Sequence, residues 1–355
     1  MYDRILAVIA ACLYYGGLVK LGRWWVRQLG PRLIILNYHA ATEGDLRQHL
    51  LYLRHHYRLL HLESALEELF CPSPPDDVRD RRTPLVITFD DGYYDNYTHC
   101  FALACELQIP MTIFLIPGYI ETGDRFWWLE PDYLVAHASV SEVTIKGQTY
   151  HLNKSEERAA LAEAIDARLR FAASVHERET YLMDVRQLLA VPYTVTLEEK
   201  SSLPISWAEL QIMETCEWIS FGGHTMHHPI LAYLTDPSEV EYEVQASRAE
   251  LEQHLASSIR SFAYPVGKLS DIGEQAVRSV QKAGYAWAVT TIDGFNTPRS
   301  NPYLLYRFTV DVQQHWLIVA AKVSGIWNIF TNLLRAPMKL LPYLQDNLRA
   351  GVVNK

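Results

Sequence analysis

Two kinds of feature are scarce in this 355-residue sequence: paired cysteine motifs and clustered positive charge. The cysteines number five and contain no Cys-x-x-Cys pair, so neither a disulfide scaffold nor a cysteine-based zinc site is expected. We therefore expect unpaired, buried thiols in a reducing compartment at Cys12, Cys71, Cys100, Cys105 and Cys216. The net charge is -9 and no long basic run occurs, which argues against a nucleic-acid partner.

The remaining composition is that of a folded domain. Hydrophobic residues make up 49% and charged residues 21%, enough for one large core and too little charge for wholesale disorder. The 9 Trp and 21 Tyr suit sugar stacking, but they suit a protein core equally well.

The N-terminal segment, residues 1–30, combines an apolar run with basic residues. Residues 5–19 carry no charge and are short for a full membrane span. Lys20, Arg23 and Arg27 follow the run, and no small-residue cleavage site precedes them. We expect an uncleaved helix in a membrane face, with the cytoplasmic side favoured and the cell envelope as the alternative. A helix packed against the folded domain explains the run equally well.

Short apolar runs alternate with helical patterns along residues 31–312. Runs of this kind are typical of parallel strands buried on both faces, and the alternation predicts an α/β fold with a parallel sheet or barrel. Strands are expected at 32–38, 85–89, 111–116, 218–221, 259–264, 286–291 and 304–310. Helices are expected at 46–56, 64–70, 97–108, 238–256 and 273–283.

Two segments depart from this alternation. Residues 126–206 are too long for one connection, so we expect an inserted α+β segment with a hairpin near 143–152 and a helix near 155–171. Its first residues, Phe126-Trp127-Trp128, would form a sugar-stacking wall or, as we expect, anchor the insertion. The tail, 313–355, predicts an amphipathic membrane-facing helix or a helix that closes the core.

Two adjacent carboxylates follow one predicted strand, in the segment Thr88-Phe89-Asp90-Asp91-Gly92. Active sites of α/β barrels lie at the carboxyl ends of the strands. A divalent cation held by one Asp would keep the other ionised and able to act as a base. Taken alone, the pair is equally typical of solvated acids in a surface turn.

Two histidines follow another predicted strand, at His224 and His228. Four residues apart, they would lie on the same side of one helical turn. Two imidazoles and one carboxylate form a three-ligand site for Zn²⁺ or a similar ion, with further positions open for water and substrate. The alternative is a polar surface loop, in which the neighbouring His227 would be equivalent to the other two.

These two motifs resemble those of the polysaccharide deacetylase family, the NodB-homology domain of carbohydrate esterase family four. Thr-Phe-Asp-Asp-Gly and His-Ser/Thr-x-x-His are its first two motifs, and the resemblance extends over about residues 32–310. It implies a distorted barrel of seven β/α units for the deacetylase domain, 31–312. It also implies that Asp90 is the general base and that Asp91, His224 and His228 hold one divalent metal ion. Zinc is expected, with cobalt, nickel or manganese as alternatives.

The third family motif is altered here. Tyr264, Pro265 and Gly267 match its Pro-x-Gly turn and predict a substrate or oxyanion region, but Ala263 stands where the family has an arginine that orients the base. Arg307, late in the last predicted strand, is a candidate replacement. A surface ion pair is an equally good explanation of Arg307.

The family's usual general acid, a late histidine, has no convincing match, because His315 has different neighbours. His39 ends the first predicted strand, so a barrel would place it at the same rim as Asp90, and we predict that it is the acid. A residue that simply ends its strand is the alternative.

The expected activity is hydrolysis of N- or O-acetyl groups on a polysaccharide, an amino-sugar glycan or a lipid-linked sugar. Two alternatives remain open at this point. One is a related metal amidohydrolase that acts on a small non-sugar amide. The other is a sugar-binding homologue without turnover, which the missing arginine at position 263 and the lack of a clear general acid favour.

Overall fold

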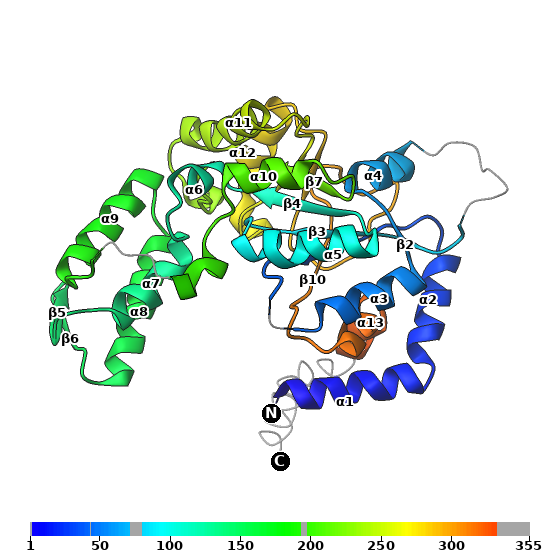
Figure 1. Ribbon diagram of the computed structural model, residues 1–355, viewed down its shortest axis with the longest axis horizontal. Coiled ribbons are helices and arrows are strands. Elements are labelled where there is room, and N and C mark those ends of the chain that lie inside the picture. Colours follow the sequence, from blue (N-terminus) through cyan, green and yellow to red (C-terminus); the bar gives the residue numbers. More distant parts are fainter. Residues whose placement is uncertain (1, 43, 72–79, 193–196, 332–355) are drawn as a thin grey trace, which may run out of the picture.

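The computed structural model describes residues 2–42, 44–71, 80–192 and 197–331, which form a curled parallel sheet surrounded by helices (Figure 1). The main sheet contains β1 (Ile34–Tyr38), β2 (Arg58–Leu59), β3 (Pro84–Phe89), β4 (Met111–Leu115), β7 (Ile219–Gly223), β8 (Ser261–Ala263), β9 (Trp287–Val289) and β10 (Phe308–Thr309). Its order is β10-β1-β3-β4-β7-β8-β9, and β2 pairs with β3 at one side. Every one of these pairs is parallel.

The sheet closes on itself through a single parallel bridge between Val289, at the end of β9, and Leu305, just before β10. Every residue of β1 and β4 is buried, as expected for strands that pack on both faces. This architecture confirms the predicted distorted barrel. Some strands are shorter than predicted, since within 304–310 the strand β10 comprises only Phe308–Thr309 and Leu305 adds a single bridge.

Helices cover the outside of the barrel. In chain order the helices and helical turns are α1 (Tyr2–Tyr15), α2 (Leu18–Gln28), α3 (Leu46–His56), α4 (Leu62–Phe70), η1 (Asn96–Phe101), α5 (Ala102–Leu107), α6 (Pro117–Thr122), η2 (Trp127–Leu129), α7 (Glu130–Ala136), α8 (Ser155–Arg170), α9 (Val175–Leu188), η3 (Leu197–Ser202), α10 (Trp207–Glu214), η4 (Leu231–Tyr233), α11 (Pro237–His254), α12 (Leu269–Lys282) and α13 (Trp316–Val323). The helix expected over 97–108 is interrupted, because η1 is a π-helical turn.

Within the predicted insertion, residues 126–192 form a lobe at one side of the barrel (Figure 1). The lobe contains η2, α7, the antiparallel hairpin of β5 (Glu142–Ile145) and β6 (Gln148–His151), α8 and α9. It has its own buried cluster, which includes Leu134, Leu161 and Val185. This second core is what allows so long a segment to interrupt the barrel.

The two ends of the described chain pack together. Helix α13 is largely buried, and α1 lies against it. Of the predicted tail, 313–355, residues 332–355 lie outside the described residues, and the part up to 331 belongs to this helical layer. Within the described ranges no single helix is long and apolar enough to cross a membrane, whereas α1 and α2 together meet that test as a pair bent by 68°.

The expectation of five unpaired, buried cysteines is wrong. Cys105 of α5 and Cys216, just before β7, form a disulfide across 111 residues of sequence. Cys12 and Cys71 are exposed, and of the remaining thiols only Cys100 is buried. Spacing could not reveal the pair, because α5 and the start of β7 meet only in the folded barrel.

Candidate active site

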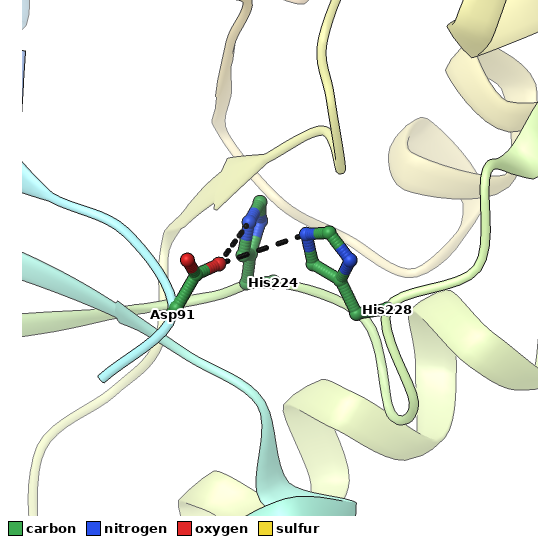
Figure 2. A group of neighbouring side chains, drawn as sticks. All are labelled: Asp91, His224 and His228. Atoms are coloured by element: carbon green, nitrogen blue, oxygen red, sulfur yellow. Dashed lines mark ion pairs between the residues drawn. The ribbon is translucent and has the colours of Figure 1, made fainter. Parts of the chain in front are cut away.

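Asp91, His224 and His228 converge at the carboxyl ends of β3 and β7 (Figure 2). The Nε2 atoms of His224 and His228 lie 3.4 Å and 3.6 Å from Asp91 Oδ1. One ligand atom from each of the three residues lies within 4.8 Å of the others, and all three side chains are buried. The predicted ligand set is therefore brought together in space.

The predicted helical turn between the two histidines is wrong. Residues 224–228, here called the ligand loop, are irregular, and Thr225 and His228 have φ values of 65° and 55°. The Thr225 Oγ1 accepts the backbone N–H of His228 at 2.9 Å, and its hydroxyl donates to the His224 carbonyl at 2.5 Å. A threonine-centred turn thus aims both imidazoles at Asp91.

The surroundings of the two imidazoles fit a bound cation. His224 Nδ1 lies 2.7 Å from the Ala263 carbonyl, which leaves Nε2 to face Asp91 as an acceptor. Burial, the nearby His224 and Arg178 hold the pKa of His228 well below its usual value, so this imidazole is neutral. Burial lowers the pKa of His224, but the carboxylates of Asp91 and Asp90 raise it overall, which reflects a negative potential that favours a cation.

Arg307 forms a paired interaction with Asp90. Its Nη1 and Nη2 donate to Asp90 Oδ1 and Oδ2, each at 2.7 Å, and Nε donates to the Thr290 carbonyl at 2.7 Å. The Arg307 side chain is 0% exposed, which excludes the surface ion pair. An arginine from the strand that closes the barrel therefore contacts Asp90, although Ala263 occupies the family's arginine position.

The ionisation of Asp90 reflects this arrangement. Burial is the largest single influence and raises its pKa, but the charges of Arg307 and His224 and the hydrogen bonds from Arg307 outweigh burial and hold the pKa below its usual value. Each carboxylate oxygen offers two acceptor positions, so a lone pair remains after the bond to Arg307. Asp90 is thus kept as a carboxylate that faces the cleft.

The insertion holds the ligand loop from outside the barrel. Trp127 Nε1 donates to the His228 carbonyl at 2.9 Å. Arg178 Nη2 donates to the His227 carbonyl at 2.9 Å, and the Arg178 side chain is almost fully buried. Sequence reasoning missed Arg178, because a single arginine on the helix of an insertion carries no local signal.

His39 lines the same cleft, which has a volume of about 500 Å³. Its side chain is exposed, and its carbonyl accepts a 2.9 Å hydrogen bond from Asn96 Nδ2, which ties the end of β1 to η1. His315 does not line the cleft; its Nδ1 caps α13 by accepting the Leu317 N–H at 3.3 Å.

The turn at residues 264–267 contributes one residue that the sequence had not singled out. Tyr264 is buried and its hydroxyl donates to the Tyr303 carbonyl, while the N–H groups of Tyr264 and Gly267 bond to Val289 and Pro265. Val266 lines the cleft at a φ of 59°. Among the described residues, no protein acceptor lies within hydrogen-bond distance of its N–H. The free donor of this turn is therefore Val266.

The aromatic cluster at the start of the insertion has both of the roles considered for it. Phe126 and Trp127 are buried in the core of the insertion, as the anchoring interpretation expects. Trp128 is partly exposed in the cleft, with its ring centre 4.3 Å from that of His228, and its Nε1 donates to the Tyr93 hydroxyl at 2.8 Å. Arg170 and Lys268 also line this cleft, and neither was singled out.

Comparisons with known proteins agree with this fold. Three solved structures share the fold. The deacetylase PplD of Streptococcus pyogenes, in complex with acetate, is 16% identical with a TM-score of 0.50, over 79% of this chain and 93% of that one. The BpsB deacetylase domain of Bordetella bronchiseptica is 14% identical with a TM-score of 0.51, over 79% and 96%. IcaB of Ammonifex degensii is 18% identical with a TM-score of 0.54, over 83% and 98%.

The sequence itself was compared with curated proteins and with family models. No curated protein matches. The polysaccharide deacetylase family model matches residues 77–288, which include the strand ends that carry Asp90, Asp91, His224 and His228. The match extends over more than half of the chain, and the chain therefore belongs to the polysaccharide deacetylase family.

Proposed function

We propose that this protein hydrolyses acetyl groups on amino sugars of a polysaccharide and that it does so with one bound divalent cation. The observation that carries the proposal is the meeting of two units at one rim: the ligand set Asp91, His224 and His228, and the ion pair of Asp90 with Arg307. One unit has the donor set of a hydrolytic metal site, and the other is a buried carboxylate kept ionised beside it.

The cation would be held by Asp91 Oδ1 and by the Nε2 atoms of His224 and His228. A carboxylate with two imidazoles suits Zn²⁺ first and also Co²⁺, Ni²⁺ or Mn²⁺. Bound there, the ion supplies Lewis-acid polarisation of the substrate carbonyl and of the attacking water.

Asp90 is proposed as the general base, and Arg307 positions it. The guanidinium fixes the plane of the carboxylate and stabilises its charge, so the remaining lone pairs can accept a proton from water. As that water adds to the acetyl carbon, negative charge develops on the carbonyl oxygen. The N–H of Val266 is the proposed backbone donor to that oxygen.

His39 is proposed as the general acid. It lines the cleft from the end of β1, beside β3. Histidine is the side chain that most readily carries a proton near neutral pH, and an amine leaves poorly unless it is protonated. The products are acetate and a free amino sugar.

Two observations weigh against the alternatives. A cleft of about 500 Å³, bordered by Trp128 and Tyr93, offers more room and more aromatic surface than a small amide needs. One of the two arguments for a binding protein without turnover was the missing arginine at position 263; the other was the lack of a clear general acid. Arg307 removes the first argument, because it contacts both oxygens of Asp90.

The test combines metal analysis with acetate release from acetylated glycans. Wild-type protein is expected to contain about one divalent ion per chain, and chelation should abolish turnover. His228→Ala should lower metal content and activity together, since two protein ligands form a weak site. His227→Asn is the matched control, because His227 Nδ1 pairs with Glu243 instead of joining the ligand set. Full metal occupancy in His228→Ala, or turnover that chelation does not affect, would refute the assignment.

A further inference from the structure

Helices α1 and α2 present large apolar side chains to solvent. Trp24, Trp25 and Leu21 are 48%, 55% and 54% exposed, which is unusual for side chains of this kind within one helix. We call the whole set the α1–α2 apolar stripe; its members are Ile5, Val8, Tyr15, Leu18, Leu21, Trp24, Trp25 and Leu29.

The stripe faces outward because the other side of α2 is docked. Val19 and Val26 are buried, and Gly22 lies so close to the backbone after α13 that a Cβ atom there would come within 2.7 Å of the Ser324 carbonyl oxygen. A glycine at this contact lets the helix pack tightly, so α2 cannot turn its apolar stripe inward.

Beside the stripe lies a basic pocket of about 260 Å³, between α2, the end of α3 and the start of β3. Its lining residues are Lys20, Arg23, Arg27, His55, His56, Tyr57, Arg82 and Thr83. Arg82 pairs with Asp80, whereas within the described ranges Lys20, Arg23 and Arg27 have no carboxylate at ion-pair distance. Arg23 Nη1 donates to the Tyr52 hydroxyl at 3.3 Å, and the charges of all three cations remain open to an outside anion.

The local charge opposes that of the whole protein. The chain carries a net charge of -9, yet its first 30 residues contain four basic residues and one acidic residue. The pKa of His56 is consistent with a positive potential in this pocket. Burial, followed by the charges of Arg23, His55 and Arg82, lowers this pKa to about 4. Positive charge is therefore concentrated next to a segment in which eight large apolar side chains are exposed.

We propose that this face binds the surface of an anionic phospholipid bilayer, with the basic pocket taking lipid phosphate groups and the apolar stripe entering the headgroup region. Adjacent basic and apolar stripes on a helix are typical of interfacial helices, and Trp favours that depth in the membrane. A protein partner or a second copy of this chain would account for the apolar stripe alone. An anionic surface accounts for the stripe together with three cations that pair with no carboxylate among the described residues.

The experiment measures co-sedimentation of the full chain with vesicles. Vesicles of phosphatidylcholine alone are compared with vesicles made of equal parts of phosphatidylcholine and phosphatidylglycerol. Binding is expected only to the anionic vesicles, and it should weaken as salt is raised. The double variant Lys20→Gln with Arg27→Gln should bind roughly fivefold more weakly for each charge removed. Trp24→Ser with Trp25→Ser should also lose binding, because less apolar surface enters the membrane.

A charge-matched control is Arg278→Gln with Lys282→Gln, two exposed cations of α12 that pair with Glu274 and Glu241. This control should bind vesicles as the wild type does. All three double variants should release acetate from a soluble glycan at the wild-type rate, and this result separates the membrane proposal from the catalytic one. Equal binding to both kinds of vesicle would overturn the proposal. Binding of inorganic phosphate, measured by calorimetry, without any binding of vesicles would also overturn it. A wild-type dimer that the double variant Trp24→Ser with Trp25→Ser converts to monomers would overturn it as well.

Discussion

The two sides of the cleft are held in place by different parts of the chain. On the base side, Asp90 is bound by Arg307, and both residues belong to barrel strands or their ends. On the metal side, the ligand loop depends on donors from the insertion, because Trp127 and Arg178 bind its carbonyls. The barrel thus positions the proposed base, Asp90, whereas the insertion positions a proposed metal ligand, His228. Disturbing either partner should change one property of the site and spare the other.

The largest effect is expected when the base itself is removed. Asp90→Asn keeps nearly the same shape but cannot accept the proton, so turnover should fall about 10² to 10⁴-fold. The metal content should remain, because Asp90 is not in the ligand set. Acetate release and metal content are measured on folded protein, since the buried Arg307 loses its counter-charge and stability falls. Near-normal turnover would show that another group is the base.

The next effect concerns the residue that positions the base. In Arg307→Gln, the positive charge that offsets the effect of burial on Asp90 is removed, so the pKa of Asp90 should rise. Because the ionised form is active, the acid limb of the pH–rate profile should move to higher pH. Misorientation should also lower turnover about 10²-fold at neutral pH.

Arg307→Lys separates these two contributions. It retains a charge but not the two-point contact, so a smaller shift of the acid limb is expected. The free energy of unfolding should fall in both variants, and by less in Arg307→Lys than in Arg307→Gln. The lowered pKa of Asp90 stabilises the wild-type fold above its unfolded-state pKa, and this contribution disappears as the pH falls. An unchanged acid limb in both variants would contradict the positioning role.

A third, smaller effect should appear on the metal side alone. Arg178→Met removes a donor to the His227 carbonyl, which should weaken metal binding about 10 to 100-fold as measured by competition with a chelator. The acid limb set by Asp90 should stay in place. Arg168→Met, which breaks the ion pair with Glu177 elsewhere in the insertion, is the control. Equal losses of affinity in both variants would mean that the insertion acts only through general stability.

The smallest effect is expected at His39. Its side chain is exposed, so solvent water can partly replace it, and His39→Gln should slow amide hydrolysis by roughly tenfold, below the usual range for a general acid. An activated aryl acetate should be affected much less, because a phenolate leaves without a proton. Metal content should not change. Equal losses on both substrates would indicate a structural role for His39.

The local patterns in the sequence were sufficient for a parallel α/β fold, and the family resemblance added that the sheet is a barrel. Apolar runs marked its strands, and the residues that follow them, Asp90, Asp91 and His224, lie at one rim because parallel strands present their carboxyl ends together. The predicted helix at Leu46–His56 has the observed bounds. The shape of the ligand loop was not predictable in this way, since a spacing of four suits a helical turn and also the threonine-centred turn that occurs.

The sequence by itself determined the strand-and-helix alternation and the residue types at the candidate site, because each depends on residues that are neighbours along the chain. Only the tertiary structure decided that Arg307 replaces an arginine missing at position 263, that Arg178 and Trp127 hold the ligand loop, and that Cys105 meets Cys216. These contacts join segments far apart in sequence. Such contacts form when barrel closure and the docking of the insertion bring the segments together, so no local pattern records them.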